Sequence, residues 1–266
     1  MANAAAALFP PTDMLSPALK NFHDGVFVIT APGFEERQES ARRELGEGNF
    51  EFIVGINRDS TSKEELTAQG LYDEARAIKL DRSSKPMSLG HVCCSIGHRN
   101  VYQHVVDNKI ERALIFEDDV VLNPIEENEI EPIVSDIPGD AELIYWGWSG
   151  GGYRPAHATL KQALYHVQHA IGVLKYDHTM IKNLYAEPYN DHFDVAGKRL
   201  LGHSYTVTLS AAEKLLKLNT PIALNADNAL LYAVLRGEVR AYNSKVKLFG
   251  QRTMDRSDPL LTATAE

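Results

Sequence analysis

The stretch LIFEDDVVL, Leu114–Leu122, places three consecutive carboxylates inside a run that otherwise has the composition of a buried β-strand. Apolar and β-branched residues flank the acids on both sides, as in strands that are covered on both faces of a sheet. Glu117, Asp118 and Asp119 stand where the first apolar run ends. Because a carboxylate that is buried without a partner costs several kcal/mol, the fold has to supply a counter-charge.

A divalent cation can provide this counter-charge. Hard oxygen donors select Mg²⁺ or Mn²⁺ over zinc or copper, and an ion held in this way often carries the phosphates of a nucleotide. Side chains alternate along an extended backbone, so Glu117 and Asp119 can face one way while Asp118 faces the other. We therefore expect Glu117 and Asp119 to be the metal-binding pair. The alternative is that the three acids face water or cap a following helix.

The composition is that of an ordinary globular protein. The chain has 266 residues, of which 44% are hydrophobic and 24% are charged, so it can build a sizeable core in one domain or in one domain with a small lobe. Its formal net charge of -9, from 36 acidic and 27 basic residues, argues against a broad nucleic-acid footprint, because such binding depends on Lys and Arg neutralising phosphates. No nucleic-acid partner is expected.

The sequence predicts a soluble protein of the cytoplasm. No run approaches the roughly 20 apolar residues that a membrane span requires, although peripheral association with a membrane is compatible with the sequence. The alanine-rich start of the chain has no basic residue ahead of it, which predicts a loose leader over residues 1–24 rather than a secretory signal. The two cysteines, Cys93 and Cys94, are adjacent and cannot staple a fold, which fits a reducing compartment.

Strand-like and helix-like segments alternate along the chain. The expected strands are GVFVIT (25–30), FEFIVGI (50–56), ALIF (113–116), AELIYWGW (141–148) and the start of SYTVTLSAAEKLLKL (204–218). Helical spacing follows the first strand, a capping box of Ser62 and Glu65 follows the second, and Ser210 with Glu213 is expected to cap the helix after the last. This alternation predicts an α/β fold, with a mostly parallel central sheet flanked by helices. In such a sheet, ligands gather beyond the carboxyl ends of the strands, where the acidic triplet lies.

The segment 90–122, GHVCCSIGHRNVYQHVVDNKIERALIFEDDVVL, resembles the signature of glycosyltransferase family 25, the lipooligosaccharide and procollagen galactosyltransferase group. That family typically carries a stretch similar to G-E-I-G-C-x-L-S-H-x-x-x-W and, further on, L-E-D-D-V. The matching residues are Gly90, Val92, Cys94, Ile96, His98, Tyr102 and the run from Glu117 to Val120. His91, Cys93 and Gly97 stand where the pattern has Glu, Gly and Ser.

Further segments are similar to the family in the same order along the chain. They are VFVITAPGFEERQES (26–40), FEFIVGIN (50–57), AELIYWG (141–147), GHSYTVTLSAAEKLL (202–216) and KVKLFGQRTMDRS (245–257). The resemblance therefore covers most of residues 25–257, which we expect to form a single glycosyltransferase domain. A short C-terminal tail is expected over 258–266.

The resemblance implies a glycosyltransferase-A type fold and a metal-dependent, inverting transfer of a sugar, commonly galactose, from a UDP-sugar to a glycan acceptor. It implies Mn²⁺ or Mg²⁺ as cofactor, bound by Asp119 and, directly or through water, by Glu117. A divalent ion would neutralise the charge that develops on the departing nucleoside diphosphate. The residues implied to bind the donor are Thr30, Arg37, His98 and Asp118.

Inversion in one step also requires a base on the side of the sugar ring opposite the leaving group. Asp227, in LNADNALL (224–231), is the first candidate, because a short polar interruption between apolar segments puts its carboxylate at a helix start. An Asp in that place often serves only as a cap or as a partner of the helix dipole. Asp191 and Asp194, in YNDHFDVAG (189–197), are the rival candidates.

Other functions use the same residues. A different Mg²⁺- or Mn²⁺-dependent enzyme that acts on nucleotides or phosphates would need the same carboxylates. A catalytically silent glycan-binding domain would keep the fold without the turnover. Zinc is a weaker alternative, because Cys94 with His98 and His166 with His169 have helical spacing but a structural zinc site needs four ligands.

Overall fold

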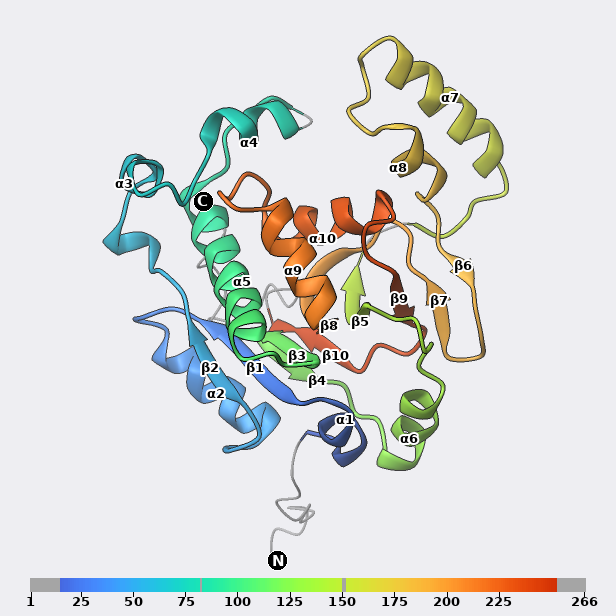
Figure 1. The fold of residues 1–266 in the computed structure, drawn as a ribbon. Coiled ribbons are helices and arrows are strands. Elements are labelled where there is room, and N and C mark those ends of the chain that lie inside the picture. The colour runs from blue at the N-terminus through green and yellow to red at the C-terminus, as the bar shows by residue number, and fades with distance from the viewer. Residues whose placement is uncertain (1–14, 82, 150–151, 253–266) are drawn as a thin grey trace, which may run out of the picture.

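The computed structural model describes residues 15–81, 83–149 and 152–252 (Figure 1). Its strands are β1 (Gly25–Thr30), β2 (Glu51–Val54), β3 (Arg112–Glu117), β4 (Val120–Leu122), β5 (Leu143–Ser149), β6 (Glu187–Pro188), β7 (Phe193–Val195), β8 (Leu200–Thr208), β9 (Ala241–Ser244) and β10 (Phe249–Gln251). Its helices are α1 (Pro17–Phe22), α2 (Glu35–Leu45), α3 (Lys63–Ala68), α4 (Glu74–Leu80), α5 (Leu89–Asp107), α6 (Glu127–Ser135), α7 (Ala158–Ala170), α8 (His178–Lys182), α9 (Leu209–Leu218) and α10 (Ala226–Leu235).

The central sheet has eight strands in the order β2-β1-β3-β8-β5-β9-β7-β6, and β4 pairs with β10 in a separate two-stranded sheet. Strand β1 runs parallel to β2 and β3, and β5 runs parallel to β9. Strand β8 is antiparallel to both of its neighbours, and β7 is antiparallel to β9 and β6. Within the central sheet, all strands except β8 and β7 therefore point the same way, which confirms the expected α/β fold with a mostly parallel sheet. The reversal of β8 is not visible in the sequence, because alternation of side chains carries no information on strand direction.

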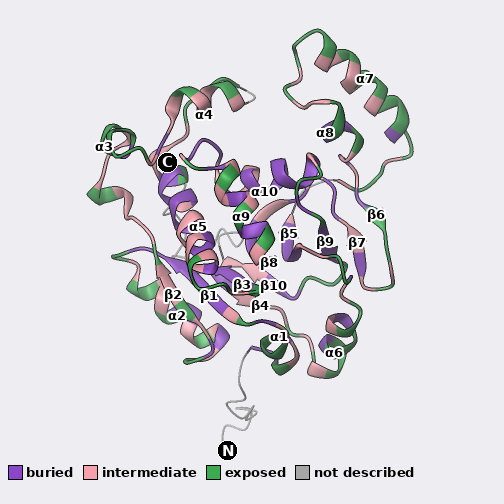
Figure 2. Ribbon diagram, viewed as in Figure 1, coloured by how far each residue is buried: buried purple, intermediate pink, exposed green. Residues whose placement is uncertain are grey.

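Both faces of the sheet are covered, as the apolar composition of β1 and β3 predicts (Figure 2). Phe27 and Ile115 belong to a core cluster that also contains buried residues of α5, α9 and α10. Their neighbours Val28 and Leu114 belong to a second cluster, which contains buried residues of α1, α2 and α6. Because successive side chains of a strand point to opposite faces, these clusters define one helical layer on each side of the sheet.

The sequence predicts two helix caps, of which the structure confirms one. Ser62 and Glu65 form the predicted capping box at the start of α3. The prediction that Ser210 caps the helix after β8 is wrong, because β8 leads directly into α9 and the Thr208 side chain accepts the backbone N–H of Ala211. The Ser210 hydroxyl instead donates to Glu142 Oε1 at 2.9 Å.

Residues 15–24, which the sequence predicts as part of a loose leader, pack against the sheet. Leu15 and Leu19 are buried at 0% and 1% exposure within the cluster that contains α2 and α6. The His23 ring makes hydrogen bonds with the Leu19 carbonyl at 2.6 Å and the Thr206 hydroxyl at 2.7 Å. Burial lowers the pKa of His23 to about 4. The leader prediction for residues 1–14 and the tail prediction for 258–266 fall outside the described residues.

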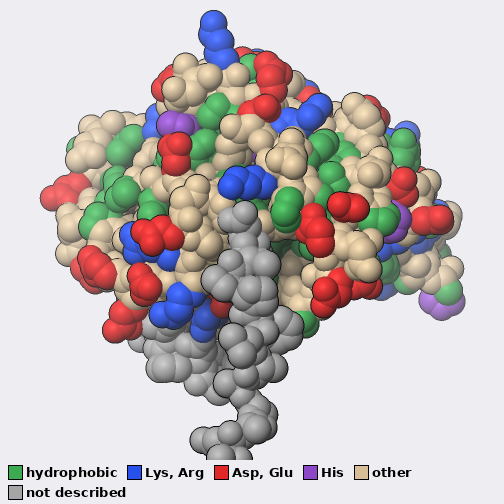
Figure 3. All heavy atoms as spheres, turned by 90° about the horizontal axis from the view of Figure 1, so that it is seen from below, with side chains coloured by type: hydrophobic (Ala, Val, Ile, Leu, Met, Phe, Trp, Pro, Cys, Tyr) green, Lys and Arg blue, Asp and Glu red, His purple; other side chains and the backbone are tan. Residues whose placement is uncertain are grey.

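None of the helices in the described ranges combines the length and the apolar character that crossing a bilayer requires. On the face of the molecule seen in Figure 3, Lys and Arg side chains are interspersed with Asp and Glu side chains. Positive charge is therefore not gathered into one area of that face.

We expect Leu19→Ala to lower the free energy of unfolding by about 2 to 4 kcal/mol, because it leaves a cavity in a packed core. Asn21→Ala, at an exposed position of the same helix, is the control and should change stability little. Denaturant unfolding of the full chain measures both values. If neither substitution changes the free energy of unfolding, α1 does not unfold cooperatively with the rest of the domain.

Candidate active site

The acidic triplet lies where the chain leaves the central sheet. Glu117 is the last residue of β3, Asp118 and Asp119 form the turn, and β4 then pairs with β10. Strand β1 ends beside this point, because Ile29 is in register with Glu117. The turn therefore stands at the carboxyl edge of the sheet, where ligands of α/β proteins bind.

Asp118 is held by two residues that the sequence places on or after the first strand. The Thr30 hydroxyl donates to Asp118 Oδ2 at 2.8 Å, and Arg37 Nη2 lies 2.7 Å from Asp118 Oδ1. The same Nη2 is 3.3 Å from Asp119 Oδ2, so one guanidinium group serves two carboxylates. Burial raises the pKa of Asp118 to about 6, against the opposing effects of Arg37 and Thr30.

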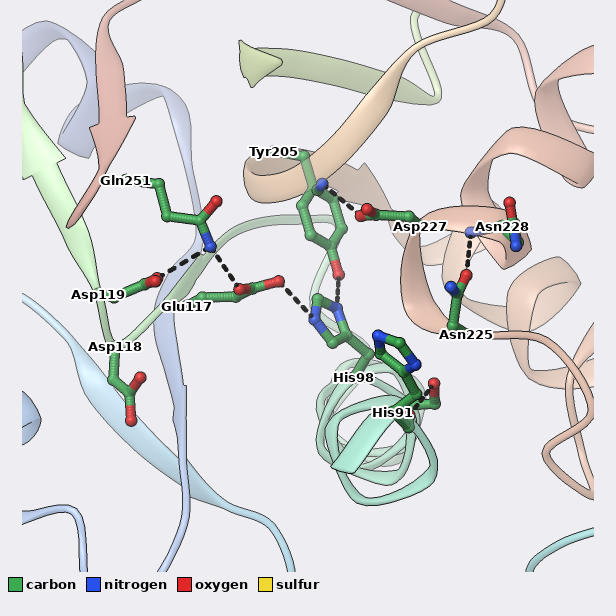
Figure 4. A network of polar contacts seen from close by, with 12 residues as sticks. His91, His98, Glu117, Asp118, Asp119, Tyr205, Asn225, Asp227, Asn228 and Gln251 are labelled. Atoms are coloured by element: carbon green, nitrogen blue, oxygen red, sulfur yellow. Dashed lines mark hydrogen bonds and ion pairs between the residues drawn. The ribbon is translucent and has the colours of Figure 1, made fainter. Parts of the chain in front are cut away.

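Glu117 and Asp119 face together, as the alternation of side chains predicts, while Asp118 points away from them (Figure 4). The side-chain amide of Gln251, from β10, joins them: its Nε2 donates to Glu117 Oε2 at 3.1 Å and to Asp119 Oδ1 at 3.2 Å. Burial and the negative charges of Asp119 and Asp227 raise the pKa of Glu117 well above its usual range. Among the described residues, the group that bridges these two carboxylates is the neutral side-chain amide of Gln251.

A chain of hydrogen bonds reaches Glu117 from the helical layer. Tyr102 and Tyr205 contact each other through their hydroxyl oxygens at 2.8 Å, and the Tyr205 hydroxyl lies 2.7 Å from His98 Nδ1. His98 Nε2 lies 3.3 Å from Glu117 Oε1. Burial lowers the pKa of His98 to about 4, so its ring is neutral and carries one N–H. Since an ionised carboxylate can only accept, ionised Glu117 requires that proton on Nε2, and Nδ1 then accepts from Tyr205.

Asp227 lies in the first turn of α10, as predicted, but it does not cap that helix. The cap is Asn225, whose side chain accepts the backbone N–H of Asn228 at 2.8 Å. Asp227 Oδ1 instead accepts the backbone N–H of Gly202, in β8, at 2.7 Å. A Cβ on Gly202 would lie 2.7 Å from Leu230 Cδ1, so a larger residue would displace the Leu230 side chain where β8 and α10 approach each other.

The rival bases are remote from the triplet. Asp194 belongs to β7, and three strands, β8, β5 and β9, separate β7 from β3. Four spacings of about 4.8 Å put these strands roughly 19 Å apart. Asp194 Oδ1 lies 3.8 Å from Lys245 Nζ, and Asp191 is exposed in the same hairpin. Asp227, held by the strand next to β3, is the better placed of the three carboxylates.

Two cavities flank the N-terminal half of α5. A small one, of about 90 Å³, is lined by Thr30, Arg37, Glu117 and Asp118 and by Cys93 and Gly97, two of the departures from the family pattern. A Cβ on Gly97 would lie 2.6 Å from Ile29 Cγ2, so glycine lets α5 approach β1. The third departure, His91, lines a second cavity of about 820 Å³ together with Asn225 and Asn228.

One group of three potential metal ligands within 4.8 Å occurs in the described residues, and it is Cys94, His98 and Glu117. Its hydrogen bonds do not favour zinc, because both ring nitrogens of His98 already have partners. Burial also raises the pKa of the Cys94 thiol well above its usual range. The other predicted pair, His166 and His169, is partly exposed on α7, where His166 Nδ1 contacts His178 Nδ1 at 2.8 Å and the rings of His169 and His178 lie edge to face.

The fold brings together the predicted residues Thr30, Arg37, Asp118 and Asp119, and it places His98 in contact with Glu117. His98 is 2% exposed and touches Glu117 rather than either of the two cavities described above. Sequence reasoning missed Gln251. It noted Tyr102 only as a match to the family pattern, and Tyr205 only as part of the matching segment 202–216. A polar residue in the short apolar segment 248–251 was the one local signal for Gln251.

These features define an α/β protein with a cluster of carboxylates and an adjoining cavity at the carboxyl edge of its sheet. The model of glycosyltransferase family 25, described as an LPS biosynthesis protein family, matches residues 23–230. The chain therefore belongs to glycosyltransferase family 25, as its motifs predict.

Among curated proteins, the chain is similar to procollagen galactosyltransferases. Procollagen galactosyltransferase 2 of Mus musculus is 26% identical over 129 residues, which are 47% of this chain and 20% of that protein. The Homo sapiens protein of the same name is 25% identical over 129 residues with the same coverage. Procollagen galactosyltransferase 1-A of Xenopus laevis is 24% identical over 132 residues, 47% of this chain and 21% of the relative. The matches thus span about a fifth of the length of these relatives.

We expect Glu117→Gln to stabilise the metal-free protein at neutral and alkaline pH. The pKa of Glu117 is higher in the folded state than in the unfolded chain, so folding binds protons and its stability falls as pH rises above about 4.3. The variant removes this dependence and keeps an amide that can contact Gln251 and His98. Thermal unfolding with a chelator, between pH 5 and pH 8, should show an advantage of the variant that grows with pH. Glu64→Gln, on the surface of α3, is the control. If Glu117→Gln is less stable than the wild type at pH 8, the raised pKa of Glu117 is contradicted.

Proposed function

We propose that this protein is a metal-dependent, inverting glycosyltransferase of the glycosyltransferase-A type, which transfers a sugar from a UDP-sugar to a glycan acceptor. Membership of glycosyltransferase family 25 supports a sugar donor and a sugar acceptor. The names of the similar proteins, procollagen galactosyltransferases, support galactose as the sugar. The observation that carries the proposal is the cluster of three carboxylates, of which two have one Arg37 guanidinium in common and the third has no positive partner among the described residues.

The residues present fit a divalent cation. Glu117 Oε2 and Asp119 Oδ1 both approach Gln251 Nε2, so both point at one place. Asp119 Oδ2 is buried without a hydrogen bond among the described residues, and its contact there is the Arg37 guanidinium. Carboxylate oxygens are the ligands that Mn²⁺ and Mg²⁺ prefer. When bound, such an ion supplies a Lewis acid for the departing diphosphate.

The small cavity is the proposed site for the donor nucleotide. It lies at the carboxyl ends of β1 and β3, and its volume of about 90 Å³ is below the roughly 300 to 1,000 Å³ of cavities that enclose a drug-sized ligand. It therefore suits one part of a nucleotide, with the rest extending along the open edge. Arg37 Nε is buried without a hydrogen-bond partner among the described residues, so it can donate to a phosphate oxygen.

Asp227 is the proposed base. Its Oδ1 is held by the Gly202 N–H, while its Oδ2 makes no hydrogen bond within the described part of the chain. Oδ2 can therefore accept the proton of an acceptor hydroxyl as that oxygen attacks the anomeric carbon. Thr30, Asp118 and His98 then act on the donor side, where Asp118 fixes Arg37 and His98 orients Glu117.

Three other expectations stay predictions: a location in the cytoplasm, a peripheral contact with membranes, and the absence of a nucleic-acid partner. The alternative classes, another nucleotide-acting enzyme or a silent glycan-binding domain, differ from the proposal in one measurement. A glycosyltransferase releases UDP in step with the transfer of sugar to an added acceptor.

We expect Asp119→Asn to weaken Mn²⁺-supported binding of UDP by more than the roughly 10- to 100-fold that loss of an outer-shell partner costs. Isothermal titration of UDP, with Mn²⁺ and with a chelator, measures the effect. Asp191→Asn, at an exposed carboxylate, is the matched control. Unchanged binding in Asp119→Asn would remove the metal assignment.

Asp227→Asn should leave Mn²⁺-supported UDP binding intact and reduce the rate of sugar transfer by about 10² to 10⁴, the usual contribution of a general base. The amide can still accept the Gly202 N–H, so the local structure is kept. Asp194→Asn is the control that separates the rival bases. If Asp194→Asn loses activity and Asp227→Asn does not, the base has been misassigned.

A further inference from the structure

The larger cavity is walled by segments that sequence reasoning did not connect. One wall comes from the end of α4 and the chain that leads into α5, and the other comes from α7 and the chain around α8. The first turn of α10 lies between them (Figure 1). Its volume of about 820 Å³ falls within the range of cavities that enclose small ligands.

The charge of this cavity is opposite to that of the whole protein. Among the described residues, Lys85, Lys161, Lys175 and Lys198 line it, against the single carboxylate of Asp81. The chain as a whole has a formal net charge of -9. Asp81 Oδ1 is turned toward its own backbone and accepts the N–H groups of Ser83 and Lys85. The cavity is therefore a local positive site, of the kind that attracts and retains anions.

Two of these lysines have side chains available for a ligand. Lys85 and Lys161 are exposed, from opposite walls, and neither ammonium group makes an ion pair within the described ranges. Lys175 differs, because its Nζ binds carbonyl groups at the end of α4, including that of Lys79 at 3.0 Å. Lys175 therefore holds the wall of the cavity in place, and its positive charge remains at the cavity lining.

Aromatic side chains line the same space. Tyr176 and Tyr232 are edge to face, with ring centroids 6.3 Å apart, and Lys198 Nζ lies 5.8 Å from the Tyr176 centroid. Tyr165 and Tyr185 add further rings to the lining. Tyrosine offers an apolar face and a hydroxyl group together, which suits a sugar ring with its C–H face and its polar rim.

The cavity ends beside the proposed base. Asn225 and Asn228, which flank Asp227 in the first turn of α10, line it, and Figure 4 shows His91 of α5 close to the same turn. A glycan in the cavity, which the lysines also line, could therefore bring one end toward Asp227.

We infer that the acceptor is an acidic glycan, which carries a carboxylate or phosphate group that Lys85 and Lys161 bind. The inference rests on the proposed glycosyl transfer and names the class of its acceptor. A neutral acceptor would leave the positive lining of the cavity without a role in binding.

Binding of small glycans to the full chain tests this inference. Digalacturonate and digalactose share one ring framework and differ in a carboxylate at carbon 6, while galactose 6-phosphate and galactose form the matched phosphate pair. In calorimetric titrations at low salt, we expect the acidic member of at least one pair to bind about tenfold or more tightly than the neutral member. Screening should remove this advantage at high salt. The two pairs show whether the anion is a carboxylate or a phosphate.

Lys85→Gln and Lys161→Gln should each reduce the affinity for the acidic glycan toward that for its neutral partner, and leave the neutral affinity unchanged. Both positions are exposed, so the variants should fold. Lys109→Gln, an exposed lysine beyond the far end of α5, is the control and should bind all four glycans as the wild type does.

Equal binding within both pairs, or no binding of any of the four glycans, overturns the inference. A preference for acid that survives in both lysine variants also overturns it, because the anion then lies elsewhere. Mn²⁺-supported UDP binding on the same samples separates this result from the fate of the proposed function. UDP binding without a preference for acid leaves glycosyl transfer standing, whereas a preference for acid without UDP binding removes transfer and keeps the anion site.

Discussion

The site depends on an imbalance of buried charge. Three carboxylates, from Glu117 to Asp119, end one strand, and the guanidinium of Arg37 contacts only two of them. Burial and mutual repulsion keep the pKa of Glu117 far above its usual range and that of Asp118 at about 6. A structure that needed these residues only for stability would do better with neutral side chains. The unfavourable charge is explained if it is offset by a ligand, and the divalent cation of the proposed function would offset it most directly.

Neighbouring side chains fix the carboxylates of the triplet in position for such a ligand. Gln251 bridges Glu117 and Asp119 through a single nitrogen, and the neutral His98 ring connects Glu117 to a buried pair of tyrosines. Neither group carries positive charge, so they fix the positions of the carboxylates without neutralising them. A lysine in place of Gln251 would place a positive charge between the two carboxylates, where the proposed cation would otherwise supply it. The amide of Gln251 and the imidazole of His98 therefore keep the carboxylates in fixed positions and leave their negative charge uncompensated.

Local chemistry made one part of the structure predictable from sequence. An unbroken apolar run marked β1 and β3, the alternation of side chains placed Glu117 and Asp119 on one side, and the Ser62 capping box marked the start of α3. Long-range pairing was not predictable. Gln251 lies 134 residues from Glu117, and Tyr205 lies 107 residues from His98. No periodicity connects such positions, and the direction of β8, which decides both contacts of Tyr205, leaves no trace in the alternation of its side chains.

Because β8 is reversed, the site is built both from the end of one strand, β3, and from the beginning of another, β8. In a wholly parallel sheet, every strand would end at the active edge, and all polar groups there would come from strand ends. Because β8 runs the other way, it begins beside the end of β3, where Ser204 is in register with Phe116. Its Gly202 N–H holds Asp227 at the same edge from the opposite direction. The negative charge of Asp227 also raises the pKa of Glu117, so the two carboxylates lie close enough to interact electrostatically. In the proposed reaction, the triplet assists departure of the nucleotide and Asp227 activates the acceptor. The charges of these two groups therefore influence each other.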